Sequence, residues 1–215
     1  MNLSLFHLVK EPKVKLDKNP LLLLLHGYGS NEEDLFSFAE QLPEEYFIVS
    51  ARAPYALPPY GNAWYAINFD ADMNKFSDND QAIESRDLIA KFVDELIEAY
   101  PIDKDKVTLI GFSQGSILSY AVALSYPDKI QRVAALSGYL NMDIVAKDFN
   151  LKDVSKLNFF ISHGTVDQVI PVEWARKAPE FLNNLGLRSE YHEYPVGHGV
   201  APQNFYDLKD WLDKR

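Results

Sequence analysis

The stretch Lys106–Tyr126, KVTLIGFSQGSILSYAVALSY, predicts a strand, a tight turn and a helix in immediate succession. The run 107–110 is apolar and contains β-branched residues, which is typical of a buried strand. Apolar residues at helical spacing then extend from Ile117 to Leu124. Ser113 lies between the two patterns. We therefore expect Ser113 at the corner where a strand turns into a helix.

Ser113 is the centre of a G-x-S-x-G motif that begins at Gly111 and ends at Gly115. In a sharp strand-to-helix turn the two glycines lack the Cβ atoms that would collide with the neighbouring strand and helix. The serine hydroxyl then projects outward, in front of the first backbone N–H groups of the helix, which favour negative charge. The motif predicts Ser113 as a nucleophile. The alternative is a glycine-rich turn whose serine has no chemical role.

Composition narrows the class of protein. The chain has 215 residues, 47% of them hydrophobic, which is enough for one buried core, so we expect a single domain over residues 1–215. The net charge of −10 and the absence of a basic cluster in the sequence argue against a nucleic-acid partner. The chain has no cysteine, which excludes disulfides, thiolate metal sites and a cysteine nucleophile.

The sequence predicts neither a secretion signal nor a membrane-spanning segment. The first fifteen residues, MNLSLFHLVKEPKVK, lack the basic segment followed by a long apolar run that marks a secretion signal. The longest aliphatic run, Leu21–Leu25, is far shorter than the roughly 20 residues that a spanning helix needs. We expect a cytoplasmic protein without stable membrane insertion.

Strand and helix patterns alternate along the chain, which predicts an α/β fold with a mainly parallel central sheet and helices on both faces. Strands are expected at 3–9, 20–26, 46–51, 107–110, 131–136, 157–162 and 190–194, the first of them at a sheet edge. Besides the helix after Ser113, helices are expected at 30–42, 80–100, 172–185 and 202–213. Ser30 and Glu33 form the pattern of a capping box for the first of these. Segment 54–79 has no period and many aromatic residues, which favours a binding loop.

A serine nucleophile needs a base within hydrogen-bond reach, and in this topology a histidine near the end of the chain supplies it. His192 and His198 both follow Ser113 with room for an intervening acid. His192 lies inside a strand pattern and is expected to be a face residue. His198 lies between two glycines in a loop after a strand, where the backbone can aim the side chain freely. We take His198 as the base; a solvated loop histidine is the alternative.

The acid that orients the base is expected between Ser113 and His198. Asp167 follows the strand pattern that ends near Ser162, and it precedes the Pro171 turn into a helix. It is therefore expected at the same rim of the sheet as Ser113 and His198, and a turn or helix-capping aspartate is the alternative. The remaining acids fall in helical, strand or polar connecting segments: Asp128, Asp143, Asp148, Asp153, Glu173, Glu180, Glu190 and Glu193.

Two backbone N–H groups are expected to stabilise the oxyanion that forms when Ser113 attacks a carbonyl. One belongs to Gln114, and Tyr28, which follows the predicted strand and His26-Gly27, is best placed for the other. We expect His26 and His163 to be buried turn residues rather than participants in the chemistry. The scattered histidines and aspartates have no recognised metal-ligand spacing, so no metal is expected.

These motifs resemble the phospholipase/carboxylesterase branch of the α/β-hydrolases, which includes the acyl-protein thioesterases. The shared segments occur in the family's order over about Leu21 to Leu212: LHGYGSNEEDL, ARAP, GFSQGS, LSGYL, SHGTVDQVIP and YPVGHG. The resemblance implies an α/β-hydrolase fold, Ser113 as nucleophile, Asp167 as orienting acid and His198 as base. It also implies oxyanion donors at Tyr28 and Gln114 and no cofactor.

The resemblance further implies a small-molecule substrate: an ester, thioester or lysophospholipid with an apolar acyl part. Trp64 is similar to the family's tryptophan beside the site, and we expect Trp64, Tyr139 and Leu140 to contact substrate. Between Gly138 and Lys156 there are too few residues for a separate lid domain, and together with the aromatic segment 54–79 this favours an open cleft for small to medium esters. Two other functions stay open, a serine peptidase on the same scaffold and a non-catalytic binding protein that kept the fold. A homodimer also stays open.

Overall fold

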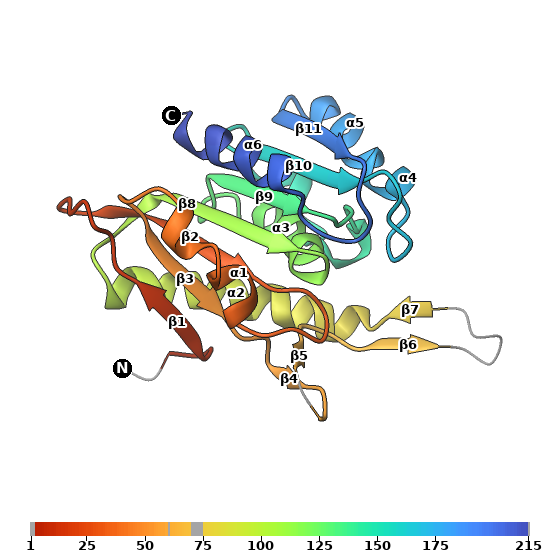
Figure 1. Ribbon diagram of the computed structural model, residues 1–215, viewed down its shortest axis with the longest axis horizontal. Coiled ribbons are helices and arrows are strands. Elements are labelled where there is room, and N and C mark those ends of the chain that lie inside the picture. The colour runs from red at the N-terminus through yellow and green to blue at the C-terminus, as the bar shows by residue number, and fades with distance from the viewer. Residues whose placement is uncertain (1–2, 60, 70–74, 215) are drawn as a thin grey trace.

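The computed structural model describes residues 3–59, 61–69 and 75–214, and its centre is a seven-stranded sheet (Figure 1). In the order in which they lie side by side, the strands are β1 (His7–Lys10), β3 (Phe47–Ala51), β2 (Asn19–Leu25), β8 (Ile102–Phe112), β9 (Arg132–Leu136), β10 (Asn158–Gly164) and β11 (Arg188–Tyr194). Only β1, at one edge, is antiparallel to its neighbour, and the remaining pairs are parallel. The predicted, mainly parallel sheet is confirmed.

The central strands are buried on both faces, as their unbroken apolar sequences predict. All seven residues of β2 are buried, and Leu23 lies opposite Val49 on one side and Leu109 on the other. Because parallel strands end at the same edge of a sheet, the loops after β2, β8, β9, β10 and β11 gather at one rim. The predicted catalytic residues Ser113, Asp167 and His198 lie in these loops.

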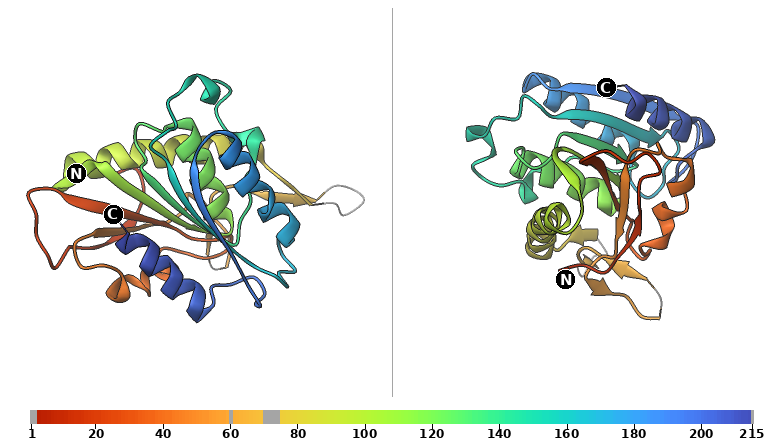
Figure 2. Two further views of the ribbon diagram at one scale, coloured as in Figure 1. Left: turned by 90° about the horizontal axis from the view of Figure 1, so that it is seen from above. Right: turned by 90° about the vertical axis from the view of Figure 1, so that its left-hand side faces the viewer.

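Helices cover both faces of the sheet, as Figure 2 shows. One face carries α2 (Asn79–Ala99), α3 (Gln114–Ser125) and α5 (Lys177–Asn184), whose buried residues belong to the larger apolar core. The other face carries α1 (Glu33–Phe36), the 3₁₀ turn η1 (Ala39–Gln41) and α6 (Pro202–Asp213). The helix predicted at 172–185 is interrupted at Arg176, where α4 (Val172–Ala175) ends and α5 begins. None of the helices in the described ranges is long and apolar enough to cross a bilayer.

The capping box predicted at Ser30 is wrong, and so is the long helix over 30–42. Ser30 pairs as an isolated bridge with Asn62, which holds its backbone outside the helix. Its hydroxyl donates to the side chain of Asp34 instead of capping an N–H group. The segment forms only the single turn α1 and then η1. The tertiary pairing with Asn62 therefore overrides the local signal.

Segment 54–79 is more ordered than expected. It contains two small antiparallel ribbons, one of β4 (Tyr55–Ala56) and β5 (Asn62–Ala63), the other of β6 (Ile67–Phe69) and β7 (Lys75–Ser77). Residues 60 and 70–74 of this segment lie outside the described part of the chain. The strands have only two or three residues each, too few for a period-2 pattern to show in the sequence.

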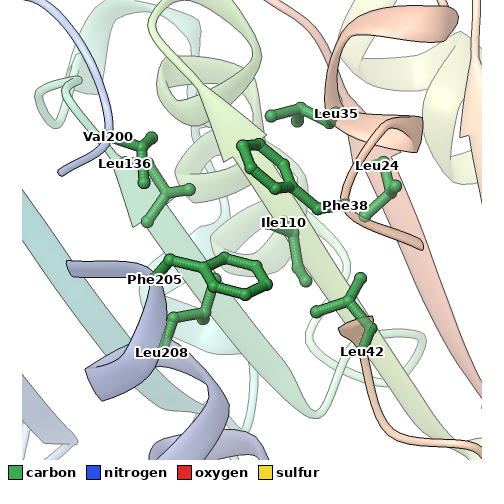
Figure 3. Close-up of a pocket in the computed structure, with 9 residues that line it drawn as sticks. All are labelled: Leu24, Leu35, Phe38, Leu42, Ile110, Leu136, Val200, Phe205 and Leu208. Carbon is green, nitrogen blue, oxygen red and sulfur yellow. The ribbon is translucent and has the colours of Figure 1, made fainter. Parts of the chain in front are cut away.

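A small apolar cavity of about 20 Å³ lies in the core under α1 and α6 (Figure 3). Its lining side chains are Leu24, Leu35, Phe38, Leu42, Ile110, Leu136, Val200, Phe205 and Leu208. Phe38 and Phe205 stack on each other there, with ring centroids 5.0 Å apart. A space of this size, with no polar lining side chain, is a packing gap rather than a binding site.

In the described residues, the connection from Gly138 to Lys156 holds only two 3₁₀ turns, η2 (Met142–Ile144) and η3 (Phe149–Leu151). A separate lid domain is therefore absent from this connection, as predicted.

Candidate active site

Ser113 occupies the strained turn between β8 and α3. Its backbone has φ 52° and ψ −114°, a conformation that L-residues rarely adopt. A Cβ atom on Gly115 would lie 2.1 Å from the carbonyl oxygen of Leu25, and one on Gly111 would lie 2.3 Å from that of Gly115. The turn therefore requires glycine at both positions. This confirms that the two glycines of the G-x-S-x-G motif are needed because a Cβ atom would collide with the neighbouring backbone.

The structure brings Ser113, His198 and Asp167 into one hydrogen-bonded chain. His198 Nε2 lies 2.9 Å from Ser113 Oγ, and His198 Nδ1 lies 2.7 Å from Asp167 Oδ2. A carboxylate accepts hydrogen bonds, so Nδ1 carries the proton and Nε2 presents a lone pair to the serine hydroxyl. This is the tautomer in which a histidine can remove a proton from serine.

Asp167 is held in its ionised form. Burial alone would raise the pKa of its carboxyl group, but hydrogen bonds from the Ile170 amide, from His198 and from the Val169 amide together lower the pKa below its usual value. The two amides bind Oδ1 at 2.9 and 2.8 Å, which leaves Oδ2 for the imidazole. The carboxylate therefore has a fixed direction as well as a charge.

Close backbone packing places the His198 loop beside the end of β10. A Cβ atom on Gly164 would lie 2.2 Å from the Gly197 carbonyl oxygen. The Val166 N–H donates to the Val196 carbonyl at 3.2 Å. The loops that carry Asp167 and His198 are thus joined along their backbones. A glycine in β10 makes this approach possible.

The two residues expected to supply oxyanion donors both lie close to the serine. Gln114 is the first residue of α3, where a backbone N–H has no partner within the helix. The loop after β2 passes directly beside the serine, since a Cβ atom on Gly27 would lie 3.3 Å from Ser113 Cβ, and Tyr28 is the next residue. Tyr28, Gln114, Ser113 and His198 all line the same cavity. The arrangement can present two N–H groups to one oxygen.

His26 anchors the loop that carries Tyr28. Its ring is fully buried, Nδ1 lies 2.7 Å from the Gly27 carbonyl, and Nε2 accepts from the Ala53 N–H at 3.0 Å. Because Nε2 accepts, the proton of the neutral ring is on Nδ1 and is donated to Gly27. The predicted structural role of His26 is confirmed by this placement.

Acidification from pH 7 to pH 5 is expected to lower the free energy of unfolding partly through His26. Burial is the main cause that lowers the pKa of His26 below 6.5, so the folded state keeps the ring neutral while the unfolded chain takes up a proton. Stability is therefore lost as the pH falls below 6.5, until the folded-state pKa is reached. Urea unfolding at pH 7, 6 and 5 should show a shallower decline for His26→Gln than for the wild type. An equally steep decline would contradict this role.

The cavity above Ser113 has a volume of about 700 Å³. Tyr139 and Leu140, two of the three predicted substrate contacts, line it. Four further lining residues come from segment 54–79, which the sequence favoured as a binding loop: Tyr65, Ile67, Ser77 and Asn79. The remaining lining residues were not predicted as substrate contacts: Ile117, Asn141, Asp143, Val169, Ile170, Trp174 and Lys177. They come from separate segments that only the folded chain brings together. A tryptophan in the predicted helix just after Asp167, Trp174, is a sequence signal that could have been noticed.

The expectation that Trp64 contacts substrate is wrong for this structure. Trp64 is fully buried and does not line the cavity. Its indole N–H donates to the His26 carbonyl at 3.0 Å, and its backbone N–H donates to the Gln114 side chain at 2.8 Å. Trp64 therefore connects the loop after β2 to the serine turn through these two hydrogen bonds. Its side chain is part of the larger apolar core.

Known proteins match this chain over almost its whole length. The sequence profile of the family described as Phospholipase/Carboxylesterase matches residues 8–215. The chain is 25% identical over 229 residues to "Acyl-protein thioesterase 1" of Mycosarcoma maydis, with 96% of this chain and 95% of that protein covered. It is 28% identical over 240 residues to the protein of the same name from Cryptococcus neoformans, with 99% and 98% covered.

Among solved structures, the Bacillus cereus carboxylesterase is similar, with a TM-score of 0.85 and 22% identity. The alignment covers 99% of this chain and 95% of that one. At this identity the likeness shows the fold alone, and it confirms the α/β-hydrolase fold expected from the sequence.

Proposed function

The chain belongs to the phospholipase/carboxylesterase family of serine hydrolases, and we propose that it hydrolyses small to medium carboxylic esters through an acyl-enzyme on Ser113. The observation that carries the proposal is the hydrogen-bonded chain from Ser113 Oγ through the His198 ring to Asp167 Oδ2. Each of its members stands at the end of a different strand of one sheet.

In the first half of the proposed reaction, His198 Nε2 removes the proton from Ser113 as its oxygen attacks the ester carbonyl. Asp167 stabilises the imidazolium that results and keeps its orientation. The N–H groups of Tyr28 and Gln114 bind the developing oxyanion. His198 then donates its proton to the departing alcohol or thiol, which leaves an acyl group on Ser113.

In the second half, a water molecule takes the place of the leaving group. His198 Nε2 removes a proton from that water, which attacks the acyl carbonyl, and the oxyanion again forms beside the two N–H groups. Collapse of this intermediate returns the proton to Ser113 and releases the carboxylic acid. The cycle uses only groups of this chain and water.

The cavity supports an ester of limited size as substrate. Its volume of about 700 Å³ is in the usual range for a small-molecule site. Ile117, Leu140 and Ile170 supply apolar wall that favours an apolar acyl group, whereas Asn79 and Lys177 give part of the lining a polar character. The same acyl group bound through sulfur would meet the same catalytic groups, so thioesters are included.

A series of p-nitrophenyl esters from acetate to octanoate, with matched thioesters, tests this function. We expect kcat/KM to rise with chain length by up to about fourfold for each methylene that becomes buried. Peptide p-nitroanilides of comparable size should react far more slowly. Hydrolysis no faster than that of Ser113→Ala, or a preference for the anilides, would contradict the proposal.

A further inference from the structure

A second histidine lies beside the proposed acid and has no part in the reaction described above. His163 is at the end of β10, four residues before Asp167, and both side chains are fully buried. His163 Nε2 lies 2.8 Å from the carbonyl oxygen of Ile170 and 3.3 Å from Asp167 Oδ2. His163 and His198 therefore both meet Asp167 at the same oxygen, Oδ2.

The partners of His163 define where its proton is. The Ile170 carbonyl can only accept, so Nε2 must carry hydrogen, and this N–H faces both that carbonyl and Asp167 Oδ2. His163 Nδ1 is buried and has no hydrogen-bond partner in the described structure. A leucine or methionine would fill the space without burying an unpaired nitrogen. Packing alone therefore does not account for a histidine here.

Three residues form a closed set of contacts around the carboxylate. The Ile170 N–H donates to Asp167 Oδ1, the Ile170 carbonyl accepts from His163, and His163 Nε2 reaches Asp167 Oδ2. The Asp167 N–H also donates to the Gly164 carbonyl, next to His163, at 3.3 Å. The turn that presents Asp167 is therefore fixed at two backbone groups of Ile170: its N–H, which donates to Asp167, and its carbonyl, which accepts from His163. Without His163, one of those two attachments is lost.

We propose that His163 is a positioning residue for Asp167: its Nε2–H fixes the 167–170 turn and the direction in which Oδ2 meets His198. The inference rests on the proposed function, because it acts through the proposed acid. His163 does not line the cavity and does not touch the reacting atoms. Its removal should therefore change kcat more than KM.

The test compares His163→Leu, which removes the donor, with His163→Gln, which keeps an N–H donor on a flexible side chain. His192→Leu is the matched control. His192 lies beside Ser162 on the neighbouring strand β11, and its ring contacts Phe160 and Tyr194 rather than the Asp167 carboxylate. Kinetics with p-nitrophenyl butyrate are combined with the low-field proton resonance of His198 Nδ1–H, which reports its hydrogen bond to Asp167. Thermal unfolding checks that each variant is folded.

We expect kcat of folded His163→Leu to fall by about tenfold or more, since a small misplacement of a catalytic group has effects of this order. Its low-field resonance should shift or broaden, His163→Gln should recover most of both properties, and His192→Leu should match the wild type. A folded His163→Leu with wild-type kcat and an unchanged resonance would overturn the proposal.

A second measurement needs no variant. The ¹⁵N shifts of the wild-type protein should show hydrogen on Nε2 of His163, and a His163 ring with hydrogen on Nδ1 alone would overturn the proposal even if His163→Leu did not fold. If the wild type hydrolysed no ester, the proposed function would fail by itself. The tautomer and the low-field resonance would still decide the role of His163.

Discussion

Replacement of Ser113 by alanine is expected to lower kcat for ester hydrolysis by roughly 10⁵-fold or more, because the covalent route is lost completely. The fold should persist, since the variant removes one oxygen atom from a residue that is only 8% exposed and lines the cavity. The remaining rate would come from the oxyanion donors and from substrate binding. Steady-state kinetics with p-nitrophenyl butyrate, together with thermal unfolding, measure both parts of this expectation.

Ser116→Ala is the matched control. Ser116 lies one turn further along α3, and its hydroxyl is buried without a hydrogen-bond partner in the described structure. The same chemical change there should leave kcat within about twofold of the wild type, because no hydrogen bond is lost. Comparable losses in the two variants would show that activity depends on the local fold rather than on the Ser113 oxygen.

Asp167→Asn is expected to lower kcat by about 10⁴-fold while the turn around it stays folded. The amide oxygen of asparagine can still accept from the Val169 and Ile170 N–H groups, so its NH₂ group would face His198. A donor at that position favours the tautomer with hydrogen on Nε2, which can no longer take a proton from serine. The substitution therefore reverses the tautomer without emptying the site.

The measurement is the pH profile of kcat for Asp167→Asn and for Asp128→Asn. Asp128 is an exposed aspartate in the connection after α3, and it was one of the other acids between Ser113 and His198 in the sequence. Asp128→Asn should follow the wild-type profile at every pH. An Asp167→Asn enzyme with more than about a tenth of the wild-type kcat near neutral pH would show that another group orients His198.

Much of the site could be predicted because each residue carries a local signal. The glycines of the serine turn are required by contacts with Leu25 and with the start of α3, so the motif reports a real backbone constraint. Asp167 and His198 could be placed because each follows a recognisable strand, and parallel strands end at one rim. The hydrogen bonds that join them depend on those same strand ends.

The features that could not be predicted depend on contacts between distant segments. Ser30 has the sequence of a helix cap, yet its pairing with Asn62 determines its structure. Trp64 resembles a residue beside the site, but its hydrogen bonds to His26 and Gln114 place it in the core. No short window of sequence contains Ser30 with Asn62, or Trp64 with His26 and Gln114. The partners of His163 do lie within seven residues of it, but which ring nitrogen meets the Ile170 carbonyl depends on the folded turn.

Covalent labelling of Ser113 tests the central claim most directly. The protein is treated with a fluorophosphonate, and the modified peptide is located by mass spectrometry in the wild type, Ser113→Ala and Ser116→Ala. We predict one irreversible adduct on the Ser113 side chain, the same adduct in Ser116→Ala, and none in folded Ser113→Ala. A folded wild-type protein that takes up no label, or labelling of Ser113→Ala equal to that of the wild type, would contradict the account.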